Sequence, residues 1–211
     1  AVSAGCYAEC VRIKSEAMRQ TEQRVERMMN MILEWIVSFT REYYFKQHKR
    51  QDYQGDQAIE SATQYCQQLC LYIKRVSSSM RERVEEALAD PWLHHLAIRM
   101  LHAIMHDLLK RSVVSESGAL ALLRDAQLYC TLIPREIAPN NAHLSFVYGA
   151  CLKDLSRIFM VRLEAVRAVV QEGGLASVDL KLLLPFIAAR ADVKATPRLM
   201  NKYFPDYYTG M

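Results

Sequence analysis

The chain has 211 residues, of which 51% are hydrophobic and 24% charged, and it carries a net charge of +4. This balance is typical of a soluble globular domain and excludes a disordered chain. The most apolar stretches are short or interrupted by charges, so none predicts a membrane span. The seven glycines do not show the spacing of a dinucleotide fingerprint or a phosphate-binding loop. The mild, evenly spread positive charge predicts no nucleic-acid partner and is compatible with weak contact to an anionic membrane.

The chain begins at Ala1 without Met, and no basic segment precedes an apolar run. We therefore expect no signal peptide and interpret the chain as a fragment of a longer polypeptide. The six cysteines lack C-x-x-C spacing, which predicts reduced thiols in the cytosol, most of them small core residues.

The first predicted element is a long helix over residues 8–47. Neither glycine nor proline occurs between Gly5 and Gly55, and apolar residues recur with the heptad spacing of a coiled coil. The members of this heptad stripe are Val11, Met18, Val25, Ile32 and Phe39, with Met29, Ile36 and Tyr43 four positions further on. At 1.5 Å per residue the helix is roughly 60 Å long, so it is predicted to lie along a partner helix.

A second predicted helix over residues 58–88 supplies that partner. Its apolar residues follow three- and four-residue steps from Ala58 to Val84. The short polar connector favours an antiparallel hairpin of the two helices. The methionines at positions 28, 29 and 31 are interpreted as core filling, with a plastic partner-binding surface as the alternative.

Later helices are predicted from their start and stop signals. Asp90 and Pro91 predict a third helix that begins there and ends near Val113. A fourth helix over residues 118–132 is predicted to stop at Pro134.

Asn140 and Asn141 predict the start of a long helical region that either continues or bends near Met160 and ends at Gly173 and Gly174. Ser177 predicts a helix that is kinked at Pro185, and Thr196 with Pro197 predicts a short terminal helix.

Together these patterns predict an all-α fold of about seven helices, an elongated stack of antiparallel helical bundles with the long hairpin first. We expect residues 1–115 to hold the hairpin plus the third helix, and residues 116–211 to form a C-terminal bundle.

Candidate sites of chemistry are few. His95, His102 and His106 share one face of the third helix, but Arg99 and Lys110 lie on the same face and would repel a cation, so we interpret this face as solvated. A metalloprotein that uses these histidines is the alternative. A Cys–His nucleophile built from Cys130 or Cys151 with His143 lacks an oxyanion hole. We expect no catalytic, metal or cofactor site.

The tip of the first hairpin combines basic and aromatic residues. Lys46, Lys49 and Arg50 closely follow Tyr43 and Tyr44, and charges of this kind are typical of a solvated helix end. Such tips also suit acidic partners or phosphoinositide headgroups. We treat the three cations as candidate partner-binding residues.

Three segments of the second half resemble a known family. They are residues 118–129, residues 155–166 and, above all, residues 179–204, which contain Arg190-Ala191-Asp192 followed by a short basic helix that ends in an aromatic residue. Their order and spacing over residues 110–204 resemble the C-terminal end of the Sec-ten subunit of exocyst, within the CATCHR superfamily of multisubunit tethers. Related Golgi and endosomal tethers carry a similar closing signature, and another helical scaffold or adaptor is the remaining alternative.

The resemblance implies a non-enzymatic subunit of a complex that holds a transport vesicle at its target membrane before SNARE-mediated fusion. The implied partners are sister subunits and a small GTPase or SNARE. The implied location is cytoplasmic, peripheral to the vesicle or plasma membrane. Within the resembling segment we expect a basic contact surface formed by Arg190, Lys194, Arg198 and Lys202.

Overall fold

The computed structural model describes residues 2–47, 53, 61–108, 114–137, 142–176 and 178–190. These residues form seven α-helices, and their one β-type contact is an isolated bridge between Val114 and Arg190. The predicted all-α fold is confirmed. None of the described helices is long and apolar enough to cross a bilayer.

The chain divides into two compact units, residues 1–39 and residues 40–211. The first unit is the single helix α1, Val2–Phe39, where the heptad spacing predicts a helix. The predicted pairing of this helix with the next one as a hairpin stays a prediction, because α2 belongs to the second unit. The predicted division at residues 115 and 116 falls inside the second unit, between helices that pack on each other.

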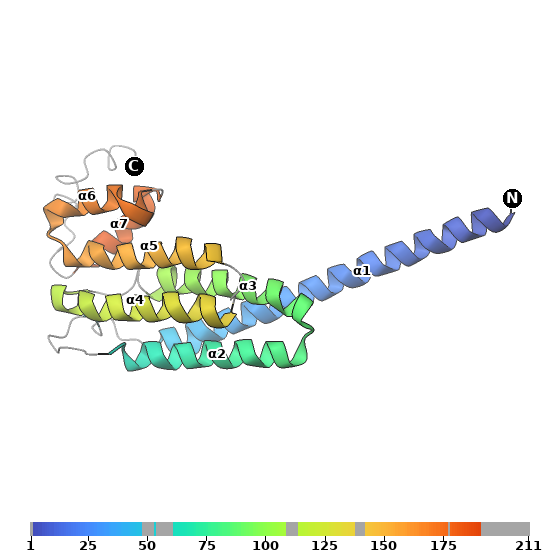
Figure 1. Cartoon of the computed structure of the whole chain (residues 1–211), viewed down its shortest axis with the longest axis horizontal. Coiled ribbons are helices and arrows are strands. Elements are labelled where there is room, and N and C mark those ends of the chain that lie inside the picture. The colour runs from blue at the N-terminus through green and yellow to red at the C-terminus, as the bar shows by residue number, and fades with distance from the viewer. Residues whose placement is uncertain are drawn as a thin grey trace. The chain divides into compact units, whose positions relative to one another are not determined.

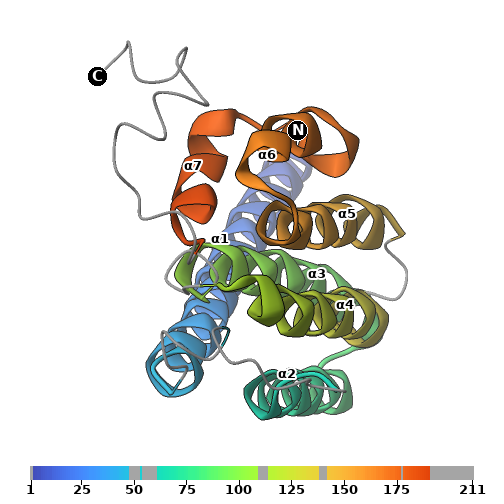
Figure 2. The same cartoon turned by 90° about the vertical axis from the view of Figure 1, so that its left-hand side faces the viewer.

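Four helices of the second unit run side by side in alternating directions (Figures 1 and 2). They are α2 (Gln64–Arg83), α3 (Glu86–Ala103), α4 (Glu116–Ile137) and α5 (Ala142–Met160). The short helices α6 (Val166–Gln171) and α7 (Leu180–Ala188) pack on α5. The core consists of buried apolar side chains, among them Leu69, Ile73, Leu93, Met100, Leu122, Leu152, Leu155, Ile158 and Phe186. Burial of each such side chain contributes about 1.5–3 kcal/mol.

Two helix starts differ from those predicted. α2 begins at Gln64 instead of residue 58, because Thr63 is its N-cap and accepts a hydrogen bond from the Cys66 N–H. α3 begins at Glu86, so the prediction that Asp90 caps it is wrong. Pro91 lies inside this helix, where it removes one backbone hydrogen bond.

α4 is longer than predicted at both ends. Ser115 caps it, since the Ser115 Oγ accepts the Gly118 N–H at 3.0 Å. The helix also continues past Pro134 to Ile137. Its C-terminus is closed by Arg81 of α2, whose guanidinium donates to the carbonyls of Glu136 at 2.5 Å and Ile137 at 3.2 Å. These bonds satisfy carbonyls that a helix end otherwise leaves without partners.

The long helical region predicted after Asn141 bends near Met160 and does not continue as one helix. α5 ends at Met160, and Arg162 is extended before the next turn begins. Gly173 has a φ of +62°, and a Cβ there would lie 2.6 Å from Asp154 Oδ2, so this position requires glycine. The predicted caps Asn140, Asn141 and Ser177 and the terminal helix from Thr196 lie outside the described residues.

Candidate functional site: an exposed apolar face on α1

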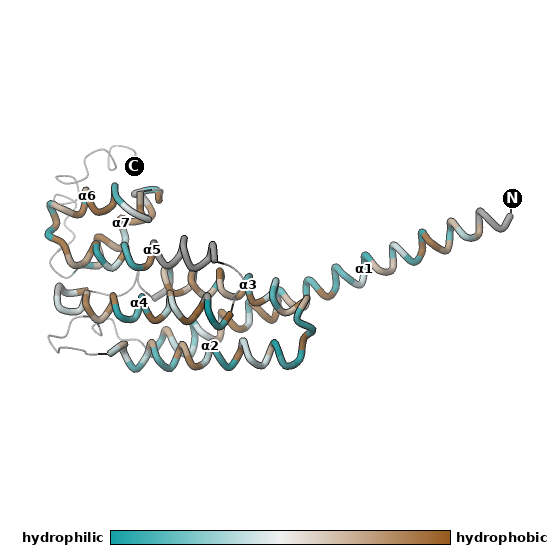
Figure 3. Tube along the Cα trace, in the orientation of Figure 1, coloured by the Kyte–Doolittle hydropathy of each residue, from teal (hydrophilic) through white to brown (hydrophobic). Residues whose placement is uncertain are grey.

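α1 exposes an unusual number of large apolar side chains. Figure 3 shows apolar and polar residues alternating along its length. Val11, Met18, Val25 and Ile32 of the heptad stripe are 44–53% exposed. A second stripe on the neighbouring side consists of Ile13, Met28, Met31 and Trp35, which are 56–70% exposed. We call these eight residues, together with the exposed Tyr7, the apolar face of α1.

The width of this face suits contact with more than one helix. At about 100° per residue, the two stripes occupy roughly 160° of the helix circumference. A two-stranded coiled coil buries a narrower stripe, whereas a helix inside a bundle buries a face wider than about 100°. The apolar face of α1 therefore fits between two neighbouring helices better than against one.

The charges of α1 balance each other. Its acidic residues are Glu9, Glu16, Glu22, Glu26 and Glu34, and its basic residues are Arg12, Lys14, Arg19, Arg24 and Arg27. Glu9 pairs with Arg12 at 2.6 Å and Glu16 with Arg19 at 2.7 Å, both on the polar side of the helix. Hydrogen bonds from Arg19 and Gln20 lower the pKa of Glu16 to about 2. A neutral helix is not attracted to an anionic membrane, so protein is the better match for its apolar face.

The predicted basic contact residues differ in how far the structure exposes them. Lys46 is exposed and forms an ion pair with Glu42. Arg190 is only 5% exposed, so the prediction that it is an exposed basic residue is wrong. The others, Lys49, Arg50, Lys194, Arg198 and Lys202, lie outside the described residues.

The predicted histidine face spans α3 and the π-helical turn that follows it, and it has the exposure that its spacing predicts. His95, His102 and His106 are exposed, and the His102 and His106 rings lie 5.1 Å apart. Within the described ranges no three His, Cys, Asp or Glu side chains are grouped so that they could hold a metal ion. Of the cysteines, Cys66 and Cys70 are buried as predicted, whereas Cys6 and Cys10 are exposed.

The sequence matches a protein family over most of its length. The family model described as "Exocyst complex component Sec10-like, alpha-helical bundle" matches residues 2–200. The chain belongs to this Sec10-like family. The predicted resemblance is confirmed, and it extends through the first 110 residues as well.

Exocyst complex component 5 of Mus musculus and that of Homo sapiens are each 20% identical to the chain over 191 residues, 89% of its length. The chain spans about a quarter of the length of these relatives, since the match covers 26% of each.

Arg190, in the closing segment that resembles Sec-ten, has a structural role in the second unit. Its guanidinium donates to the Ile158 carbonyl and, at 2.6 Å, to the Val161 carbonyl, which lie at the C-terminus of α5. The adjacent Ala189 carbonyl accepts the Val114 N–H at 3.0 Å. Arg190 thus closes α5 as Arg81 closes α4, and it fixes the end of α7 beside the start of α4.

A substitution separates this structural role from a contact role. We expect Arg190→Met to lower the free energy of unfolding by about 2–3 kcal/mol, because two buried hydrogen bonds from a charged donor are lost. Arg157→Met is the matched control; it removes an exposed pair with Asp154 and is expected to cost less than about 0.5 kcal/mol. Urea unfolding measures both. If Arg190→Met were as stable as the wild type but bound partners more weakly, Arg190 would have a contact role instead.

A second structural feature of the fold, missed by sequence reasoning, is the buried carboxylate of Asp125. This side chain of α4 accepts hydrogen bonds from the Tyr53 hydroxyl at 2.8 Å, the Thr63 N–H at 2.7 Å and the Thr63 hydroxyl at 2.6 Å. Burial raises the pKa of Asp125, and the bonds from Thr63 and Tyr53 oppose that rise. The signal in the sequence was an aspartate on the apolar side of a helix, in line with Leu122 and Tyr129. Its partners lie about 60 residues or more away along the chain.

Proposed function

We propose that the chain is part of a structural, non-enzymatic subunit of an exocyst-like complex, which holds transport vesicles at a target membrane before SNARE-mediated fusion. The observation that carries this proposal is the Sec10-like family match over residues 2–200. The subunit acts in the cytoplasm, peripheral to the vesicle or plasma membrane, and contributes helix-to-helix contacts.

The apolar face of α1 is the proposed contact with sister subunits. Its width suits two amphipathic helices, and its balanced charge favours protein over lipid. Exposed apolar surface of this extent is typical of a protein-interaction site. A small GTPase or SNARE is a further proposed partner, with Lys46, Lys49, Arg50, Lys194, Arg198 and Lys202 as proposed contact positions.

Affinity purification of the full-length protein tests the proposal. We expect the wild type to recover several other exocyst subunits. Val25→Glu places a charge in the apolar face and is expected to lower that recovery by about tenfold or more, since an unpaired charge is costly to bury. Gln23→Glu is the matched control, because it adds the same charge on the exposed polar side of α1.

Three results would contradict the proposal. The first is recovery of the wild type alone, and the second is recovery with a set of Golgi tether subunits. The third is an equal loss in Val25→Glu and Gln23→Glu, which would place the contact away from the apolar face.

A further inference from the structure

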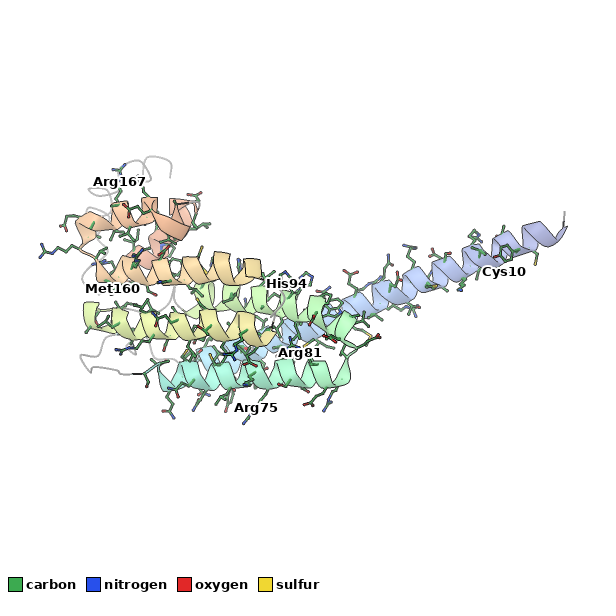
Figure 4. All side chains as sticks on the ribbon, in the orientation of Figure 1. Cys10, Arg75, Arg81, His94, Met160 and Arg167 are labelled. Atoms are coloured by element: carbon green, nitrogen blue, oxygen red, sulfur yellow. The ribbon has the colours of Figure 1, made fainter. Side chains whose placement is uncertain are left out.

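Three tyrosine rings form a continuous cluster on the second unit. The rings of Tyr43 and Tyr44 meet edge to face with centroids 5.1 Å apart, and those of Tyr44 and Tyr72 are also 5.1 Å apart. Tyr43 is 53% exposed, and Leu71, beside Tyr72 in α2, is 56% exposed. The exposed Arg75 projects from α2 on the side away from α4 (Figure 4). We call Tyr43, Tyr44, Leu71, Tyr72 and Arg75 the Tyr-Arg patch.

A rare backbone turn presents this patch. Thr40–Phe45 is a π-helical turn that packs on α2 and on a second π-helical turn, Ile104–Leu108. Thr40 and Phe45 are both buried. In an α-helix, the side chains of residues five apart point in directions that differ by roughly 140°. The wider π turn lets the side chains of Thr40 and Phe45 both point inward while Tyr43 stays exposed. Such turns are rare and occur frequently at functional sites.

The charge around the patch is positive. Burial and the neighbouring Tyr43 raise the pKa of Tyr44, and the positive charge of Arg75 opposes that rise. The nearby Glu42 is already in an ion pair with Lys46. Tyrosine and arginine are also the residue types that carry much of the binding energy at protein interfaces.

A protein partner fits this surface better than a membrane does. Attraction to anionic lipid typically needs a cluster of about 4–8 cations. Among the residues that the structure describes, the exposed cations in and beside the patch are Arg41, Lys46, Lys74 and Arg75. Of these, Lys46 pairs with Glu42, and Lys74 pairs with Glu136 at 3.5 Å.

We propose that the Tyr-Arg patch binds an acidic segment of a partner protein. The tyrosine rings cover apolar atoms of that segment, and Arg75 pairs with one of its carboxylates. The three rings already pack on one another, so little conformational entropy is lost on binding. This surface belongs to the second unit, and its role does not depend on the apolar face of α1.

Site-specific photo-crosslinking in the full-length protein tests this. The photoreactive residue p-benzoylphenylalanine replaces Leu71, and crosslinked peptides are identified by mass spectrometry. The same residue in place of Leu120, which is 49% exposed on α4, is the positional control. We expect the Leu71 probe to capture one segment rich in Asp and Glu. Arg75→Glu is expected to lower its yield by about tenfold, while Arg167→Glu, an exposed position on α6, leaves it unchanged.

The remaining outcomes would overturn the proposal. They are a phospholipid adduct, a captured segment without acidic residues, a yield no higher than at Leu120, or an equal loss in both charge reversals. Loss of sister subunits in Val25→Glu with an intact Leu71 crosslink would leave this proposal standing.

Discussion

Gly118→Ala is expected to destabilise the second unit by about 3 kcal/mol, although the same change inside an exposed helix normally stabilises it. A Cβ at Gly118 would lie 1.6 Å from the Tyr53 carbonyl oxygen and 2.3 Å from its carbon. Because both atoms belong to the backbone, no side-chain rotation relieves the overlap. Displacement of Tyr53 also breaks the bonds that its carbonyl accepts from the Ser115 N–H at 3.0 Å and the Ser115 hydroxyl at 3.2 Å.

Urea unfolding followed by circular dichroism measures this effect. Leu120→Ala is the matched control, because Leu120 lies in the same part of α4 with its side chain 49% exposed; we expect a change within about 0.5 kcal/mol. If Gly118→Ala were as stable as the wild type, Tyr53 would not approach α4 as described.

Asp125→Ala is expected to cost about 3 kcal/mol or more of unfolding free energy. Asp125 and Tyr53 are both fully buried. Removal of the carboxylate leaves the Tyr53 hydroxyl and two Thr63 donors without their acceptor in a place that water does not reach. Because Thr63 caps α2, the start of that helix loses order as well. Denaturant unfolding measures the cost, and local hydrogen exchange at the first turn of α2 reports the cap.

The pH dependence of Asp125→Asn provides an independent check. Because the pKa of Asp125 is raised in the folded state, folding favours the protonated carboxyl. The stability that the protonated carboxyl contributes is complete below the unfolded-state pKa of about 3.9. It is lost as the pH rises through the folded-state pKa. The wild type is therefore expected to gain stability relative to Asp125→Asn as the pH falls from 7 towards 4. A stability difference that shrinks over this range would mean that the folded-state pKa of Asp125 is lowered.

The helices could be predicted from the sequence because their signal is local. The heptad stripe from Val11 to Ile32 predicts α1, and the three- and four-residue steps of later segments predict the helices of the second unit. The family resemblance rested on segments whose residues have structural roles, since Gly118, Asp125 and Arg190 all hold distant parts of the chain together.

The boundaries and the buried polar groups could not be predicted because they depend on tertiary contacts. Pro91 and Pro134 are typical start and stop signals, but packing keeps both inside helices that lose one backbone hydrogen bond each. Arg190 follows an apolar helix, and a charged residue there is usually exposed. Its burial follows from the position of the α5 terminus, some 30 residues earlier in the chain.

The central claim is that the apolar face of α1 is covered by other subunits in the assembled complex, and thiol alkylation tests it directly. Cys10 (Figure 4) is exposed and lies next to Val11 on this side of α1. Cys6, four positions earlier in the chain, is also exposed. Cys130 and Cys151 react more slowly, since burial raises the pKa of both thiols, that of Cys130 to about 12. We expect Cys10 alkylation, followed by mass spectrometry, to be fast in the isolated chain and about tenfold or more slower in the complex. Equal rates in both would contradict the account.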